Sequence, residues 1–377
     1  MVKNLIKSFT FLTKSNKKQR NPNIDFIRII GMMAIIIHHL IIHGGIKDKY
    51  IKFRNQIVLL DILCKWHVNS FGIISGLVNN KSIKFSNLLY LWFLVLFYSF
   101  ILHLKYKNYE KGKYNKDLIK IIFPVIHQEY WYFTSYFGMY PFLNFINLGI
   151  SHISSTEFKK SVYFIIGIFI IWSSYFQDKF AQHSGYSPIS LIILYLIGAY
   201  MSRYIFNIKL NSLYRFLTSF ICIALFIIVS ISCYNININN FVPKNNSKLK
   251  GLFAIRINSF SMLLQVISII IFISNIKFNN NNLSSMITFI GSLTFDVYLI
   301  HYNPYIINIY LKTIFKYEKS YFKLKDIYSL IFKKCFFIFI ICIFIAYIRN
   351  IIFTFLKIRK ICFFLEHLIT KILNYCI

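Results

Sequence analysis

The feature that most constrains the fold is a run of nineteen residues, from Ile24 to Ile42, that is apolar except for Asp25, Arg28 and two histidines. A helix of this length spans about 28 Å at roughly 1.5 Å per residue, close to the hydrocarbon thickness of a bilayer. An arginine at this depth costs about 2.5–3.5 kcal/mol. The run therefore predicts a transmembrane helix in which Arg28 needs a partner, a cavity or a ligand, and Asp25 is the nearest partner.

Helix geometry places several of these polar side chains on one face. His39 follows Arg28 by eleven residues, which is three turns plus roughly 20°, so both side chains project the same way at about 16 Å separation. Asp25 and His43 extend the stripe by i−3 and i+4 spacing, whereas His38 points away from it. We interpret the stripe as a site where two substrates meet inside the membrane. The alternative is that the histidines only pack or form structural hydrogen bonds.

Composition indicates an all-α, polytopic membrane helix bundle, because 57% of residues are hydrophobic. The net charge of +31 raises the possibility of nucleic-acid binding, but no soluble basic domain is present to carry such a site, so we expect no nucleic-acid partner. Seven cysteines are scattered through apolar runs without metal-ligand spacing, which predicts no metal site.

The pattern divides the chain into three parts: a basic cytoplasmic leader over residues 1–22, a transmembrane domain over 23–349 and an amphipathic interfacial tail over 350–377. Ten spans would put both termini on the cytoplasmic side of the cell membrane (plasma or inner membrane). The expected spans cover residues 24–42, 57–78, 87–104, 121–146, 162–175, 188–206, 213–233, 252–273, 283 onward, and 327–348.

Five segments together resemble the acyltransferase-3 family of integral-membrane O-acyltransferases, and more narrowly its surface-polysaccharide O-acetyltransferase branch. The first is the acid, arginine and histidine pattern of the opening helix. The others follow in the expected order and are VNSFGIISG from Val68, YWYFTSYFGMYPFLN from Tyr130, GYSPISLIILYLIGAY from Gly185 and SLTFDVYLIHYNP from Ser292.

The resemblance implies further site residues. Many relatives carry arginines shortly after the pair that corresponds to Ser75 and Gly76, where they hold coenzyme A phosphates, and here only Lys81 and Lys84 stand there. An ammonium is a point charge without the bidentate grip of a guanidinium. The YLIH segment makes His301 a possible site residue, with Tyr298 on the same helix face. Trp131 is either an interfacial anchor or a surface on which a sugar stacks.

The expected reaction moves an acetyl group from acetyl-coenzyme A to a hydroxyl of a surface polysaccharide or its lipid-linked precursor. We expect His39 to be the general base, since histidine titrates near neutral pH. Arg28 holds a phosphate of the donor or orients it, and Asp25 fixes Arg28. The bilayer, the donor and the glycan are the expected partners. One alternative function is a flippase or transporter for polyprenyl-linked sugars, although no internal repeat is visible in the sequence. The other is a structural or sensory membrane protein without catalytic activity.

Overall fold

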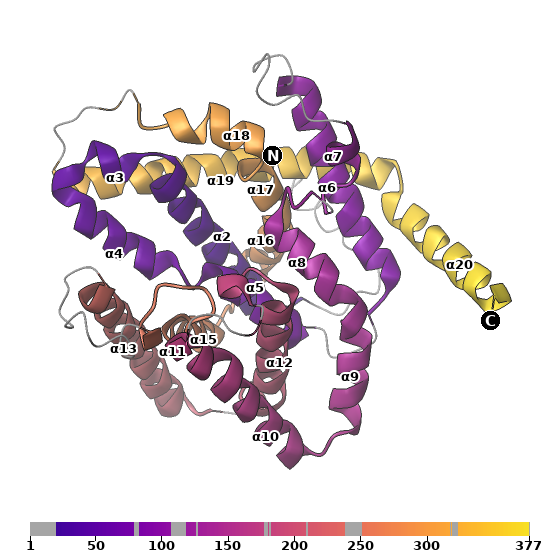
Figure 1. Ribbon diagram of the computed structural model, residues 1–377, viewed down its shortest axis with the longest axis horizontal. Helices are drawn as coiled ribbons and strands as arrows, with labels where there is room; N and C mark the ends of the chain where they lie inside the picture. Colours follow the sequence, from indigo (N-terminus) through magenta and orange to yellow (C-terminus); the bar gives the residue numbers. More distant parts are fainter. Residues whose placement is uncertain are drawn as a thin grey trace.

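The computed structural model describes residues 20–78, 83–106, 118–125, 127–176, 180, 182–208, 210–237, 251–316, 318 and 323–376. Within these ranges the regular elements are all helical, with no strand, so the predicted all-α class is confirmed. Figure 1 shows the helices gathered into a bundle, from which the last helix, α20, projects away.

Helix α2 (Pro22–His43) lies at the centre of the bundle and carries the polar stripe. Its start is fixed locally, because the Asn21 side chain accepts a hydrogen bond from the Asn23 backbone amide and Pro22 occupies the first turn. Asn23 then donates its side-chain amide to the carbonyls of Ile273 and Ile276, each at 2.8 Å. These bonds satisfy carbonyls at the end of a neighbouring helix, α15.

The elements that follow α2 range from single helical turns to a helix of 32 residues. In chain order they are α3 (Ile46–Lys49), η1 (Ile51–Phe53), α4 (Arg54–Cys64), α5 (His67–Val78), α6 (Phe85–Tyr106), α7 (Leu118–Ile122), α8 (Trp131–Met139), η2 (Tyr140–Phe142), α9 (Leu143–His152), α10 (Ser155–Ile165), η3 (Ile166–Trp172), α11 (Ser173–Phe176), η4 (His183–Gly185), α12 (Pro188–Tyr204), α13 (Ser212–Asn237), α15 (Phe260–Ser274), α16 (Asn281–Ser292), α17 (Thr294–His301), α18 (Pro304–Ile309), η5 (Leu311–Thr313), α19 (Leu324–Phe355) and α20 (Ile358–Cys376).

Six helical segments in the described part of the chain are long and apolar enough to cross a membrane. They cover Pro22–His43, Ile51–Val78, Phe85–Tyr106, Ser212–Asn237, Asn281–His301 and Leu324–Phe355. Two shorter apolar helices, Pro188–Tyr204 and Phe260–Ser274, lie where further spans were expected. The structure therefore supports a multi-pass membrane protein, while the predicted count of about ten crossings is not confirmed.

Three expected spans differ clearly from the observed helices, and one of them, 162–175, is divided among α10, η3 and α11. The segment 121–146 is not one helix, because α7 ends at Ile122 and α8 begins only at Trp131. Pro124 lies in the break. Proline interrupts a helix because it has no backbone amide hydrogen to donate to the helical hydrogen-bond pattern. The segment 252–273 is shortened, because the Ser259 hydroxyl caps the first turn of α15 and leaves Arg256 in the preceding loop.

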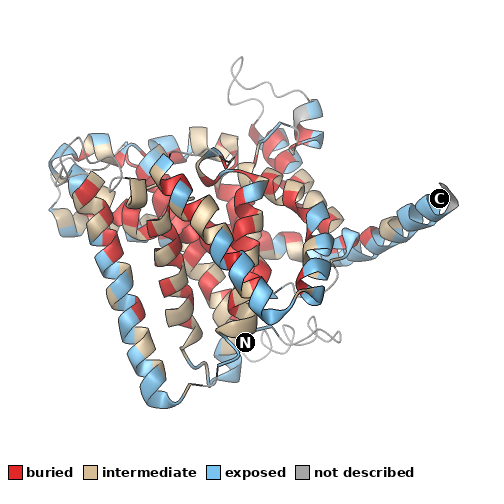
Figure 2. Cartoon of the chain, turned by 60° about the horizontal axis from the view of Figure 1, so that its bottom comes forward, coloured by how far each residue is buried: buried red, intermediate tan, exposed pale blue. Residues whose placement is uncertain are grey.

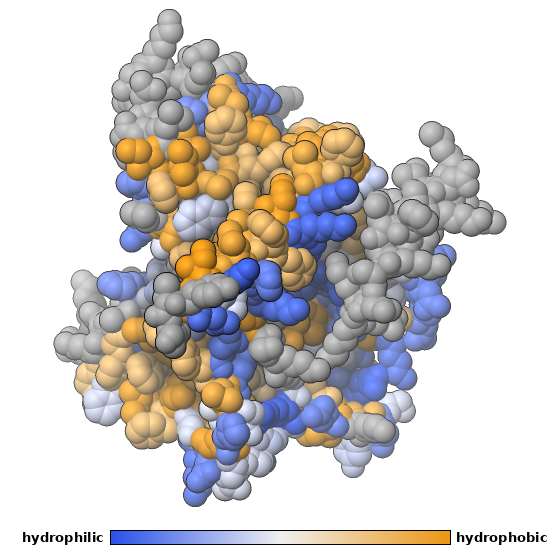
Figure 3. All heavy atoms as spheres, turned by 90° about the vertical axis from the view of Figure 1, so that its right-hand side faces the viewer, coloured by the Kyte–Doolittle hydropathy of each residue, from blue (hydrophilic) through white to orange (hydrophobic). Residues whose placement is uncertain are grey.

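Buried and exposed apolar side chains are separated in the way a bilayer requires. The central helices carry most buried residues, whereas α20 is mostly exposed (Figure 2). Helices α13 and α19 present large exposed apolar side chains such as Phe216, Phe220, Phe337 and Phe344. Figure 3 shows one side of the molecule, where hydrophobic side chains cover wide areas and hydrophilic ones are gathered between and below them. Exposed apolar surface of this extent is suited to lipid contact.

Helices α5 and α12 approach each other closely at two glycines. A Cβ on Gly76 would lie 2.0 Å from the Tyr195 carbonyl oxygen, and one on Gly198 would lie 2.1 Å from the Ile73 carbonyl oxygen. Small residues let membrane helices come this close. Gly76 therefore has a packing role, and neither it nor the neighbouring Ser75 lines the cavity described below.

A buried ion pair ties the last long helix to the bundle. Arg349 of α19 donates from Nε to the Asp296 carboxylate of α17 at 2.7 Å, and the Tyr98 hydroxyl of α6 donates to the same oxygen at 2.8 Å. Both charged side chains are almost fully buried. The predicted boundary at residue 350 lies inside α19, which continues to Phe355.

Candidate functional site

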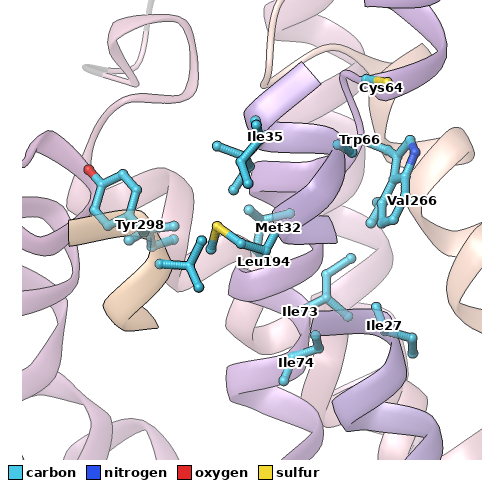
Figure 4. Packing of buried hydrophobic residues seen from close by; sticks show 14 of the residues in the cluster. Ile27, Met32, Ile35, Cys64, Trp66, Ile73, Ile74, Leu194, Val266 and Tyr298 are labelled. Carbon is cyan, nitrogen blue, oxygen red and sulfur yellow. The ribbon is translucent and has the colours of Figure 1, made fainter. Parts of the chain in front are cut away.

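A cavity of about 470 Å³ lies beside α2, inside the bundle. Figure 4 shows part of its surroundings, with Tyr298 on one side and Met32 and Ile35 of α2 on the other. The lining residues are Arg20, Arg28, Met32, Ile35, His38, His39, Ile42, His43, Lys65, His67, Val68, Phe71, Trp131, Tyr132, Tyr186, Ile257, Gly291, Ser292, Thr294, Phe295, Tyr298 and Tyr302. The volume is within the range of small-molecule sites.

Arg28 reaches the cavity from the N-terminal part of α2. Its Nη1 lies 2.5 Å from the Asp25 carboxylate, and Arg20 binds the same carboxylate through Nε and Nη2. Asp25 is buried, with 1% exposure. Gly291 of α16 packs directly over it, since a Cβ there would lie 2.5 Å from Asp25 Cβ. One carboxylate thus holds two guanidinium groups at the cavity wall, which leaves a net positive charge there.

The hydrogen bonds around His39 fix which ring nitrogen carries a proton. His301 Nδ1 faces the Val297 carbonyl oxygen at 2.6 Å, and a carbonyl only accepts, so this nitrogen must donate. In a neutral His301 the other nitrogen, Nε2, is then an acceptor, and it faces His39 Nδ1 at 3.0 Å. His39 therefore donates from Nδ1 and keeps a lone pair on Nε2, which is the form a general base needs.

Tyr302 completes the surroundings of His39 by stacking on its ring, with centroids 4.7 Å apart and planes at 25°. The ring of Tyr298 stacks on Tyr302 in turn, at 5.4 Å and 15°. Two aromatic rings from the α17 end thus hold the imidazole in place. His43, one helical turn beyond His39, also lines the cavity and contacts the His39 ring at a centroid distance of 5.5 Å.

A second buried polar pair, His38 and Asp61, lies at the same wall of the cavity. His38 Nδ1 lies 2.5 Å from the Asp61 carboxylate of α4, and Lys47 Nζ lies 3.9 Å from the other carboxylate oxygen. Beside it stands His67 of α5, whose ring centroid is 5.1 Å from that of His38. His67 is 3% exposed, and neither ring nitrogen has a hydrogen-bond partner in the described part of the chain.

The structure brings together most, but not all, of the residues predicted from the sequence. Arg28, His39, His43, Trp131 and Tyr298 line the cavity, while Asp25 and His301 lie directly behind Arg28 and His39. Lys84 is exposed and does not line it; its ammonium group lies over the ring of Phe363 at 5.6 Å. Lys81 falls outside the described residues.

Sequence reasoning missed five polar residues at or behind the cavity wall: Arg20, His38, its partner Asp61, Lys65 and His67. The available signal was the presence of Asp61, Lys65 and His67 in one otherwise apolar span, since ionisable residues at such positions mark functional sites. Among the residues that the structure describes, no group of three or more histidine, cysteine, aspartate or glutamate side chains is arranged to hold a metal ion.

Long apolar helices around an internal cavity that is lined in part by charged and histidine side chains define a multi-pass membrane protein with a site inside the bundle. A family model described as an acyltransferase domain matches residues 21–348, which is most of the chain. The protein therefore belongs to the acyltransferase-3 family, and it is a membrane acyltransferase. Comparisons with curated proteins and with solved structures found no match.

Proposed function

We propose that the protein transfers an acetyl group from acetyl-coenzyme A to a hydroxyl of a surface polysaccharide or of its lipid-linked precursor. The observation that carries the proposal is the hydrogen-bond chain from Val297 through His301 to His39, which leaves a basic nitrogen on a cavity wall that also carries Arg28. Family membership supports acyl transfer in general, and the residues of the cavity supply the chemistry.

The donor is held at the arginine end of the cavity. A guanidinium is permanently charged and suits the phosphates of coenzyme A. Arg28 is the main contact and Asp25 orients it, with Arg20 on the other side of the same carboxylate. The sequence predicted that Lys81 and Lys84 help bind the phosphates. We propose Arg20 for this role instead, because Arg20 lines the cavity and Lys84 does not.

His39 acts on the acceptor. Its Nε2 takes the proton of the sugar hydroxyl as the oxygen attacks the thioester carbonyl, and His301 stabilises the imidazolium by accepting from Nδ1. The carbon–sulfur bond breaks, the acetyl group passes to the sugar oxygen, and the proton returns from His39 to the thiolate. One histidine thus serves as base and then as acid, and transfer is direct, without an acyl-enzyme.

The proposed setting is the cell membrane, with about ten crossings and both termini cytoplasmic. Acetyl-coenzyme A then enters from the side of the Arg28 end of α2, and the glycan from the opposite side. The tail α20 has charged residues among its apolar ones and is mostly exposed, which suits a helix that lies in the membrane interface.

The test separates acetylation from sugar export. We expect cells carrying His39→Ala or Arg28→Ala to make surface glycan without the acetyl groups present in wild type, while the amount of exported glycan is unchanged. Glycan composition by mass spectrometry measures both quantities in one sample. Exported glycan that falls while its acetyl content stays constant would instead identify a flippase, and unchanged acetyl content in both variants would reject the proposal.

A further inference from the structure

The cavity is lined by positive charge at two separate places. Arg20 and Arg28 lie at one end, and Lys65 lies near His38, which is ten residues or about 15 Å further along α2 than Arg28. Among the described lining residues none is acidic. A ligand or ligands that fill this cavity therefore meet cations at both ends, and only the first of these is explained by the phosphates of the donor.

The charge of Lys65 is only partly balanced by the protein, because Asp61 attracts it from beyond ion-pair distance. In the described part of the chain no carboxylate lies within ion-pair distance of its ammonium group. The nearest acid in sequence, Asp61, is already engaged by His38 at 2.5 Å and Lys47 at 3.9 Å. A half-buried cation in a membrane protein that lacks an ion pair of its own is costly, so an anionic ligand is a suitable partner for it.

Groups suited to a sugar line the same cavity as Lys65. Trp131 and Tyr186 line the cavity and contact each other with ring centroids 4.4 Å apart, which gives an aromatic wall for the apolar face of a sugar ring. His67 follows Lys65 by two residues, lines the cavity and has both ring nitrogens unpartnered in the described part of the chain. A buried polar group without a partner is a site for a ligand hydrogen bond.

We infer that the acceptor is an anionic glycan, whose carboxylate or phosphate binds Lys65. Its sugar ring lies against Trp131 and Tyr186, His67 binds a hydroxyl or the anionic group, and the hydroxyl to be acetylated points at His39. The inference rests on the proposed function and adds to it a substrate class. It also assigns the two cationic ends of the cavity to different substrates: arginines to the donor and Lys65 to the acceptor.

The experiment uses the full chain in proteoliposomes with acetyl-coenzyme A and three matched acceptors. These are an oligosaccharide containing uronic acids, the same oligosaccharide with its carboxyl groups reduced to alcohols, and a phosphorylated oligosaccharide of the same length. We expect wild type to acetylate an anionic acceptor at least about tenfold more efficiently than the reduced one, the size expected for a charged hydrogen bond. The uronic acid and phosphate arms show which anion the site takes.

Variants of Lys65 then test whether this residue binds the anionic group of the acceptor. Lys65→Ala should raise the KM for the anionic acceptor about tenfold and leave the KM for acetyl-coenzyme A unchanged, while Lys65→Arg should retain most of the affinity. Lys312→Ala is the matched control, because Lys312 is an exposed lysine near the same end of α2 and does not line the cavity. A rise in the KM for the donor instead would overturn the assignment, as would equal use of the charged and reduced acceptors.

Binding of the glycans, measured without donor, tests the inference separately from the reaction. We expect the anionic glycan to bind wild type and Lys65→Arg, and to bind Lys65→Ala about tenfold more weakly. This result would support the site even if acetyl transfer failed and the proposed function were rejected. Equal binding to wild type and Lys65→Ala would refute the anionic subsite even if transfer succeeded.

Discussion

At the scale of single residues, the protein gives several of the expensive polar groups in its membrane domain a defined partner. Asp25 binds two arginines, Asp296 binds Arg349, and His39 is ordered through His301 by a backbone carbonyl. Partners of this kind both lower the cost of burial and hold the groups in one orientation. In the proposed mechanism, the contacts that stabilise the bundle also prepare the cavity wall for proton transfer.

The chain of histidines predicts a specific kinetic effect. Replacing His301 by alanine removes the acceptor for His39 Nδ1, so His39 can place its proton on the nitrogen that faces the substrate. We expect His301→Ala to lower kcat by roughly ten- to a hundredfold, less than loss of the base itself, with little change in KM. His301→Gln should recover part of the rate, because its amide oxygen can accept the bond. Steady-state kinetics of both variants measures the difference, and equal rates in wild type and His301→Ala would contradict this role.

The buried His38 and Asp61 pair predicts an effect on stability. His38→Ala leaves the Asp61 carboxylate short of a hydrogen-bond donor, which costs about 2–3 kcal/mol for a charged group. We expect a lower thermal unfolding midpoint of the detergent-solubilised protein. The double variant with Asp61→Asn should lose less than the sum of the two single losses, because the two residues act together. Additive losses would show that the pair is not coupled.

Helix geometry alone was sufficient to predict that Arg28 and His39 share a face, because both residues lie on one helix. It could not predict that His38 meets Asp61, that His301 meets His39 or that Asp296 meets Arg349. Each of these contacts joins different helices, and their relative positions depend on packing of the whole bundle. For Lys84 the sequence predicted a contact that the fold does not make. Its position shortly after Gly76 suggested a phosphate contact, but Lys84 lies on the exposed surface.

At the scale of elements, the bundle depends on helices that approach closely at glycines and end at capped turns. The expected spans over α2, α6, α13 and α19 were located correctly because each is a long apolar run. The segments around α7 to α9 and the start of α15 were not, because local interruptions at Pro124 and Ser259 compete with an otherwise apolar pattern. Turn chemistry outweighed hydrophobicity at these two places.

The close crossing of α5 and α12 predicts that one methyl group added at Gly76 lowers the stability of the protein. Gly76→Ala puts a Cβ against backbone atoms of α12, which cannot move as a flexible side chain would. We expect a destabilisation of about 1–3 kcal/mol, seen as a lower thermal midpoint. Gly149→Ala is the control, because no atom lies within 4 Å of the added Cβ. Similar midpoints for the two variants would contradict the close crossing.

At the scale of the whole molecule, the two ends of α2 define the two sides of the membrane. Asn23 contacts the carbonyls just before Lys277, whereas Lys312 belongs to η5, which packs near the other end of α2. If the N-terminal end of α2 is cytoplasmic, these two exposed lysines lie on opposite sides of the bilayer. The donor and the glycan then reach the cavity from different compartments.

Site-directed labelling tests this orientation. We expect Lys312→Cys to react with a membrane-impermeant maleimide in intact cells, and Lys277→Cys to react only after the cells are permeabilised. The native cysteines whose burial the structure describes are all buried, so wild type supplies the background. Labelling of Lys277→Cys in intact cells would reverse the proposed orientation.

In the proposed mechanism, His39 removes the acceptor proton at a cavity where Arg28 holds the donor. The most direct measurement is transfer of radiolabelled acetyl from acetyl-coenzyme A to purified glycan by the reconstituted protein, made together with donor binding. We predict that His39→Gln binds acetyl-coenzyme A as wild type does and transfers at least about a hundredfold more slowly, and that Arg28→Ala loses donor binding. Transfer by His39→Gln at the wild-type rate would contradict the claim.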